Sequence, residues 1–150
     1  MAAKLKPLWK CPRCGERFVG RNMWHSCGRF SLRSLFARSD PKVAKLFRKF
    51  ARMVRSCGPV HMIPQKSRVA FQVRVRFAGA IPHKSWLQVG FWFTHRYEDP
   101  RFYKIEKIPP HYYVYSMRIE SEADLDAHLQ RWLRRAYLVG QQKHLERGDL

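Results

Sequence analysis

The feature that most constrains this chain is a cluster of potential metal ligands near its start. Cys11 and Cys14 lie in the segment WKCPRCG, and His25 and Cys27 lie in the segment WHSC. A Cys-x-x-Cys turn allows both thiolates to reach one ion, and zinc is held by four such ligands in a tetrahedron. The spacing therefore predicts a small zinc-knuckle-like module over residues 1–30, with a structural Zn²⁺ bound by these four side chains.

The second pair of ligands leaves alternatives open. His25 and Cys27 are separated by one residue, which is closer than the roughly three to five residues usual in zinc fingers. Cys57 or another histidine could therefore replace one of the two. A redox-active Cys-x-x-Cys is disfavoured because no strand–helix–strand pattern surrounds it. Four protein ligands leave no open coordination position, so we expect the ion to stabilise the module without catalysing a reaction.

After residue 30, the hydrophobic pattern is first helical and then extended. Apolar residues recur every three or four positions over residues 41–57, which predicts an amphipathic helix. The period then becomes two, and Gly79 and Pro82 indicate a connection. Strands are expected near 67–77, 86–95, 101–108 and 111–119. A last helix follows Ser121, so residues 31–150 are predicted to form an α+β domain. In it, helices pack on one face of an antiparallel four- to five-stranded sheet.

The chain is strongly basic, with a formal net charge of +19 and a sequence pI of about 10.6. The first 57 residues hold 15 Lys and Arg against 2 Asp and Glu. A field of this sign attracts phosphate polymers and other polyanions. At 45% hydrophobic residues the chain is too apolar for a disordered basic tail. No run approaches the ~18 apolar residues of a membrane span, and no signal peptide is evident, so we expect a cytoplasmic protein without a membrane partner.

Two groups of residues are candidates for binding nucleic acid or another anion. One group follows the polar face of the helix expected over residues 41–57, where no acid interrupts the basic side chains. The other lies on the expected strands, where arginines of one strand and tryptophans of the next share a face. Such a surface neutralises phosphates and stacks bases. The candidates are Lys42, Lys45, Lys49, Arg52, Lys66, Arg68, Arg74, Arg76, Trp86 and Trp92.

Both groups also have a structural interpretation. Helix outer faces are commonly charged, and an arginine can stack on a tryptophan within the protein. Catalysis is less favoured than binding, because the acids are scattered, the histidines beyond His25 are isolated and no catalytic motif is present. We therefore expect a non-enzymatic, zinc-containing protein that binds nucleic acid. The alternatives are a small anionic-ligand binder or unrecognised enzyme with a pocket on the sheet, using Lys66, Arg68, Arg74 and Trp86, and an adaptor that docks on another protein through the zinc module.

The segments WKCPRCG, WHSC and PQKSRVAFQ give the chain a resemblance to an uncharacterised bacterial family, a domain of unknown function. The resemblance extends over nearly the whole length and includes residues 124–126 and 132–137. It implies a small α+β domain with a cysteine–histidine head and a bacterial origin. It implies no activity and no catalytic residue.

Overall fold

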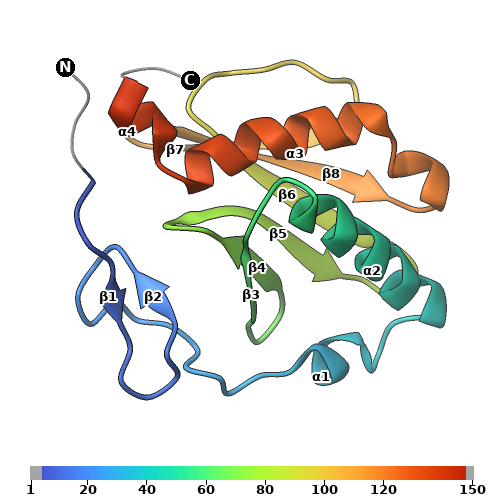
Figure 1. Ribbon diagram of the computed structural model, residues 1–150. Helices are drawn as coiled ribbons and strands as arrows, with labels where there is room; N and C mark the ends of the chain where they lie inside the picture. The colour runs from blue at the N-terminus through green and yellow to red at the C-terminus, as the bar shows by residue number, and fades with distance from the viewer. Residues whose placement is uncertain (1–4, 148–150) are drawn as a thin grey trace.

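A six-stranded antiparallel sheet with helices on one face forms the larger part of the molecule. The computed structural model describes residues 5–147 (Figure 1). Helices α2 (Pro41–Arg55) and α3 (Ala127–Gly140) lie side by side over one face of the sheet (Figure 1). The strand order is β3-β4-β5-β6-β8-β7. The strands are β3 (His61–Pro64), β4 (Val69–Gln72), β5 (Arg76–Pro82), β6 (Leu87–Phe93), β7 (Phe102–Ile108) and β8 (Tyr112–Ile119).

Shorter elements complete the described chain. Helix α1 (Leu32–Phe36) precedes α2, a 3-10 helix (Glu122–Asp124) precedes α3, and α4 (Lys143–Arg147) follows α3. A separate hairpin of β1 (Trp9–Lys10) and β2 (Arg17–Phe18) lies to the left of β3 in Figure 1. Within residues 5–147, no helix has the length and apolar character needed to cross a membrane.

The predicted α+β class and antiparallel sheet are confirmed, but the sheet has six strands and not four or five. Residues 67–77 form two strands, because the chain bends after Gln72 and β4 pairs with β5. In the bend, the backbone N–H groups of Arg74 and Val75 donate to the carbonyl of Gly140, at 2.9 and 3.1 Å. The single predicted strand was wrong because the alternation of apolar residues continues through this bend.

The strand order also departs from a simple meander. Gly79 and Pro82, which were expected in a connection, lie within β5. Strand β8 pairs with both β6 and β7, so the edge of the sheet is β7 and not the last strand of the chain. The connection from β6 to β7 therefore crosses the end of the sheet. The hydroxyl of Tyr115 on β8 accepts a hydrogen bond from the backbone N–H of Tyr97 in this connection, at 2.6 Å.

Asp99 holds the same connection against α3. Its carboxylate accepts hydrogen bonds from the backbone N–H of Arg101 at 2.8 Å and from the indole of Trp132 at 3.0 Å. Burial by itself would raise the pKa of Asp99, but these hydrogen bonds and the nearby Arg101 guanidinium lower it below its usual value. His128 lies 3.2 Å from the carboxylate, so this histidine is not isolated as the sequence suggested. These contacts of Asp99 therefore fasten the β6–β7 connection to helix α3.

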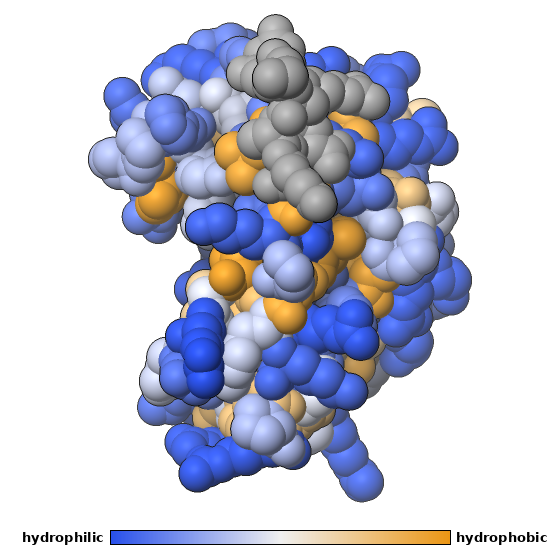
Figure 2. Space-filling view, turned by 60° about the vertical axis from the view of Figure 1, so that its left-hand side comes forward, coloured by the Kyte–Doolittle hydropathy of each residue, from blue (hydrophilic) through white to orange (hydrophobic). Residues whose placement is uncertain are grey.

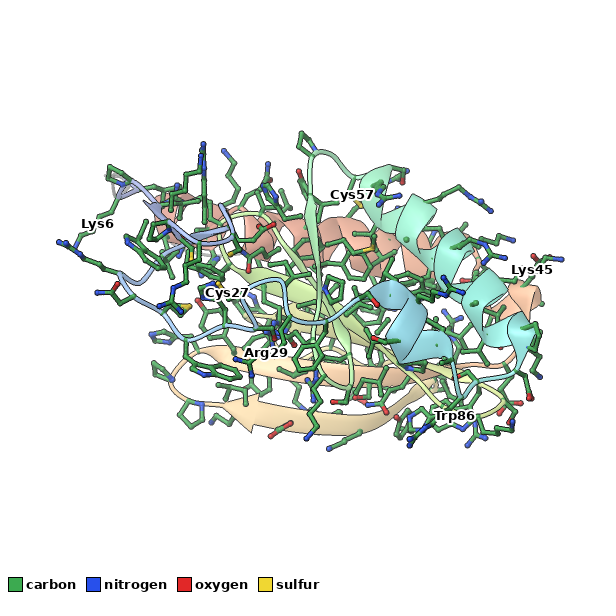
Figure 3. All side chains as sticks on the ribbon, turned by 90° about the horizontal axis from the view of Figure 1, so that it is seen from below. Lys6, Cys27, Arg29, Lys45, Cys57 and Trp86 are labelled. Carbon is green, nitrogen blue, oxygen red and sulfur yellow. The ribbon has the colours of Figure 1, made fainter. Side chains whose placement is uncertain are left out.

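The two faces of the sheet have opposite character because side chains alternate along each strand. On β6, Leu87, Val89, Phe91 and Phe93 are fully buried beneath the helices. The residues between them, Gln88, Gly90 and Trp92, face the other side. In the view from below, both long helices lie on the same side of the sheet (Figure 3). The large hydrophobic core is therefore confined to the helix-covered face.

His144 makes the folded state sensitive to acid. This imidazole is buried against Tyr112, and its Nδ1 has no hydrogen-bond partner among the described residues. Burial, and next the charge of His111, lower the pKa of His144. The unfolded chain takes up this proton below about pH 6.5, whereas the folded chain resists it until lower pH. The stability present above pH 6.5 should thus be lost as the pH falls through the folded pKa.

A thermal melting series tests this prediction. We expect the melting temperature to fall between about pH 7 and about pH 5, and to fall less in His144→Gln, which cannot titrate. Asp99 and Asp126 should not contribute to the change in melting temperature, because the pKa of each is lowered and both titrate below this range. An equal fall in both proteins would contradict the assignment to His144.

Candidate metal centre and basic surfaces

The first pair of candidate ligands lies in the tight turn between β1 and β2. The backbone N–H of Gly15 donates to the carbonyl of Cys11 at 2.9 Å, and the N–H of Cys11 donates to the carbonyl of Glu16 at 2.8 Å. Gly15 has a φ of +79°, a left-handed conformation that favours glycine. This residue therefore closes the turn in which Cys11 and Cys14 point to the same place.

The second pair completes the cluster. The Sγ of Cys27 lies 3.8 Å from that of Cys11, and the Nε2 of His25 lies 3.3 Å from the Sγ of Cys14. The four ligand atoms all lie within 4.8 Å of one another. A tetrahedral ion with metal–sulfur bonds of about 2.3 Å would hold two sulfurs about 3.8 Å apart. The geometry therefore fits a metal ion bound by all four groups.

Hydrogen bonding orients the histidine for this role. The Nδ1 of His25 lies 2.8 Å from the carbonyl of Met23. A carbonyl can only accept, so Nδ1 carries the hydrogen and Nε2 keeps its lone pair toward the cysteines. The Phe18 ring packs 4.4 Å from the imidazole. Cys57 does not replace a ligand, because its thiol lies beside the Met53 carbonyl at the end of α2.

Charge in the cluster also favours a bound cation. The backbone N–H of Cys14, and to a smaller extent that of Arg13, lower the pKa of Cys11 to about 6 in spite of the desolvation that opposes them. Burial and the neighbouring thiols raise the pKa of Cys27 to about 11. Without a cation, the three cysteines could not all be thiolates near neutral pH. A metal ion would compensate their charge and hold all three deprotonated.

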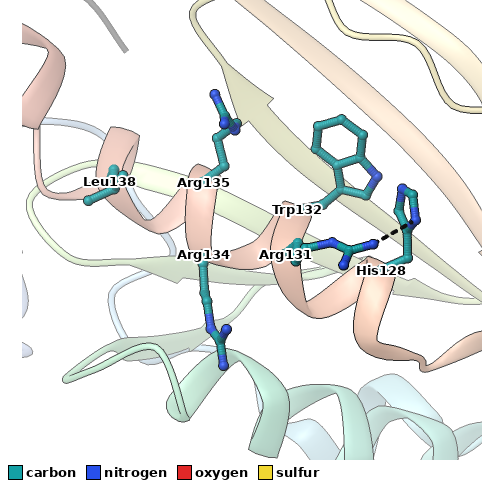
Figure 4. Close-up of a pocket in the computed structure, with 6 residues that line it drawn as sticks. All are labelled: His128, Arg131, Trp132, Arg134, Arg135 and Leu138. Carbon is teal, nitrogen blue, oxygen red and sulfur yellow. Dashed lines mark hydrogen bonds between the residues drawn. The ribbon is translucent and has the colours of Figure 1, made fainter.

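The outer surface of the two long helices carries one of the predicted basic groups and extends it. Lys42, Lys45, Lys49 and Arg52 lie on α2, together with Arg48 and Arg55. Arg131, Arg134 and Arg135 lie on α3 beside a surface hollow of about 570 Å³, with Arg134 directed toward α2 (Figure 4). The sequence analysis missed these three arginines because it considered only the apolar side of that helix.

No acid neutralises this helical surface. Neither α2 nor α3 contains Asp or Glu, and none of their nine basic side chains forms a salt bridge within the described chain. The acids at the two helix N-caps are paired elsewhere, Asp40 with Lys84 at 3.4 Å and Asp126 with Arg101 at 3.2 Å. We call the nine bases of α2 and α3 together the basic helical layer, although Arg135 lies at its far edge, where its guanidinium donates to the hydroxyl of Tyr97 at 2.8 Å.

Part of the second predicted group, the arginines and tryptophans of the strands, lies on the face of the sheet that the helices do not cover. Arg68, Arg76 and Trp92 surround a hollow of about 120 Å³ on the uncovered face, and Lys104 of β7 joins them. The α2 bases lie beyond the helix-covered face. The sequence-predicted residues therefore do not form one continuous surface, and a single short ligand could not bridge both groups.

Three predicted residues are separated from both groups or engaged within the fold. The Nε of Arg74 donates to Gln142 at 2.9 Å, and its guanidinium also bonds the Lys6 carbonyl. Lys66 lies in the β3–β4 turn. Trp86 stacks on His83 with ring centroids 3.9 Å apart, and the Arg118 guanidinium covers it at 4.2 Å. For Trp86, the cation–π interpretation is therefore correct, although with a different arginine from those considered.

Trp24 is a candidate that the sequence analysis used only as part of a motif. Its side chain is 86% exposed, and it lines a cleft of about 330 Å³ between the metal-ligand cluster and the sheet. The exposed Val19 and Met23 lie in the same part of the chain. The signal available in the sequence was the concentration of large apolar residues around the ligands of a basic module.

Comparison with known proteins places the larger part of the chain in a family. Residues 33–140 match the family described as "Domain of unknown function (DUF5655)". This region contains the six-stranded sheet and both long helices, whereas the cysteine–histidine cluster precedes it. No match was found among curated proteins or among solved structures. The expected resemblance to a domain-of-unknown-function family is confirmed, and the chain belongs to the DUF5655 family.

Proposed function

We propose that this chain is a zinc-containing, non-enzymatic protein of the cytoplasm that binds nucleic acid through the basic helical layer. One observation carries the proposal: six bases on α2 and three on α3 share a layer without a single acid. An ordinary solvated helix face mixes both charge signs, which stabilises it through pairs three or four residues apart. A layer of one sign repels itself, and a polyanion would relieve that repulsion.

The chemistry of the four candidate ligands supports zinc as the metal. Three thiolates and one imidazole form a Cys₃His set, which suits the borderline-soft zinc ion in tetrahedral geometry. Four protein ligands leave no position for water or substrate, so the ion would stabilise the module. All four cysteines are free of disulfides, as is usual in a reducing compartment, which supports a cytoplasmic location.

Duplex binding across a salt series tests the proposal. Lys45 and Arg52 are exposed and stand two helical turns apart along the outer line of α2. We expect a steep dependence of affinity on salt for the unchanged protein. In the double variant Lys45→Gln, Arg52→Gln, the log–log slope should become shallower by about 1.8, because each phosphate contact contributes about 0.9. Fluorescence anisotropy with a labelled DNA duplex gives this slope.

A matched variant separates a specific surface from net charge. Lys84 and Arg96 are exposed bases that already have acid partners, Asp40 at 3.4 Å and Glu98 at 3.7 Å. The double variant Lys84→Gln, Arg96→Gln removes the same formal charge and should leave the slope within error. Equal loss in both variants would reduce the binding to a general charge effect. No duplex binding near physiological salt would refute the proposal and favour a protein-docking adaptor.

A further inference from the structure

A trough runs from the metal-ligand cluster onto the uncovered face of the sheet. Its larger part is the cleft of about 330 Å³, which has Trp24 and His25 on one wall and Trp92 on the other. Its smaller part is the hollow of about 120 Å³ farther along the sheet. Arg76 and Trp92 line both parts, so the two are adjacent on the same face. Figure 2 shows an indentation of the molecule with hydrophobic surface beside it.

Small residues form the floor of this trough. Ala70, Gly79, Gly90 and Ser116 stand directly opposite one another across four neighbouring strands. A Cβ at Gly79 would come within 3.3 Å of the Val69 carbonyl oxygen, which is tighter than ordinary packing. Because these side chains are small, they leave a hollow in the sheet surface between the larger residues on either side.

The walls of the trough are aromatic and largely apolar. Trp24 is 86% exposed, and Met23 and Val19 beside it are 41% and 42% exposed. Trp92 is held edge-to-face by Tyr112, with ring centroids 5.9 Å apart. Large apolar side chains exposed together in a basic module indicate a binding surface. Flat rings of this kind suit ligands that also present flat rings.

Arg76 supplies a positive charge inside the trough without a partner. It is only partly exposed and has neither an ion pair nor a side-chain hydrogen bond within residues 5–147. Burial, and next the neighbouring Arg68, lower the pKa of Arg76, so the surroundings disfavour its charge. A desolvated cation is costly unless an anion pairs with it. An anionic group of a ligand would remove that cost.

We propose that the trough binds single-stranded nucleic acid, with bases stacked on Trp24 and Trp92 and a phosphate bound by Arg76. The proposal rests on nucleic acid being the partner, and it adds a second site on the face opposite the basic helical layer. The cleft and the smaller hollow lie next to each other along the sheet, which favours an extended strand over a compact anion. Arg68 and Lys104 provide further positive charges in the smaller hollow, where Glu106 is the one acid among the lining residues.

One of the four metal ligands, His25, lines the trough, so we expect the site to depend on the metal. His25 is both a ligand and a wall residue, and its Nδ1 donates to the carbonyl of Met23, the residue before Trp24. Loss of the ion would free the segment that carries Trp24. Strand binding should therefore require the metal, whereas duplex binding by α2 and α3 should not.

The test uses the full chain, a short fluorescent oligothymidylate and a fluorescent duplex. Trp24→Ala removes an exposed ring and should not affect folding. We expect it to weaken strand binding about 5- to 150-fold, the range measured for losing one base–aromatic stack. Arg76→Gln should also weaken strand binding and make its salt slope shallower by about 0.7. Chelation of the metal should weaken strand binding, and duplex affinity should stay unchanged in all three cases.

Two control variants and one competitor distinguish binding in the trough from a general loss of charge or apolar surface and from binding of a compact ligand. Ile105→Ala removes an exposed apolar side chain at the strand position opposite the core residue Tyr115, away from the trough, and Arg96→Gln removes a base already paired with Glu98, so both should bind the strand normally. Unchanged strand binding in Trp24→Ala and Arg76→Gln would overturn the trough, while duplex binding would leave the basic helical layer standing. Competition by thymidine monophosphate at the same nucleotide concentration would overturn the extended strand in favour of a compact ligand. Failure to bind either probe would overturn both proposals.

Discussion

Removal of the metal is expected to unfold the N-terminal module and leave the α+β domain folded. The module has two-residue strands, and its ligand cluster holds the segments of residues 11–14 and 25–27 together. Bound zinc contributes on the order of 10 kcal/mol to modules of this kind. The large hydrophobic core begins at Val43 and includes no residue of the module. The two parts should therefore respond separately to a chelator.

Metal analysis and limited proteolysis test this expectation. The purified chain should contain one zinc ion, and chelation should open cleavage sites within residues 10–30 while the main thermal transition remains. Cys14→Ser should have the same effect as the chelator. Cys57→Ser is the matched control, because Cys57 lies at the end of α2 and outside the cluster. A chain without stoichiometric metal, or a module that resists protease equally after chelation, would refute the metal centre.

Phe50→Ala is expected to destabilise the α+β domain and to leave the metal-binding module intact, which is the opposite of the effect of a chelator. Phe50 on α2 is fully buried and meets Phe71 of β4 edge-to-face, with ring centroids 5.7 Å apart. Truncation of a buried phenylalanine lowers the free energy of unfolding by about 3–5 kcal/mol. That loss is a large part of the roughly 5–15 kcal/mol available to a domain. The α+β domain should therefore melt at a much lower temperature, while the metal content stays at one ion.

Denaturant unfolding measures this loss, with Lys45→Ala on the same helix as its control. Lys45 is exposed and alanine is a good helix former, so the control should change the free energy of unfolding by no more than about 0.5 kcal/mol. A loss in Phe50→Ala as small as that of the control would contradict the packing of α2 on the sheet.

The ligand cluster could be predicted because its geometry is mostly local. Cys11 and Cys14 belong to one turn, and Gly15 provides the left-handed residue that closes it. The structure excluded Cys57 as a substitute ligand and gave the histidine tautomer through the carbonyl of Met23. Neither result could come from spacing, since each depends on where a distant or neighbouring backbone group lies in space.

The strands were predicted less well where a distant part of the chain decides the backbone path. The bend between β4 and β5 is fixed by the carbonyl of Gly140, at the far end of α3. The pattern of residues 67–77 gives no sign of it. Likewise, Trp86 and Trp92 have the same spacing signal, yet Arg118 covers only the first.

The sequence by itself determined the four candidate ligand residues, the apolar side of α2, and the alternation that gives β6 a buried and an open side. These properties follow from turn geometry and from the helical and extended periods, which act over a few residues. Only the tertiary structure decided that the α2 bases and Arg76 lie on opposite sides of the sheet, and that the metal-ligand segment forms a wall beside Trp92. Those placements depend on pairing and packing between residues far apart in the chain, which no local period records.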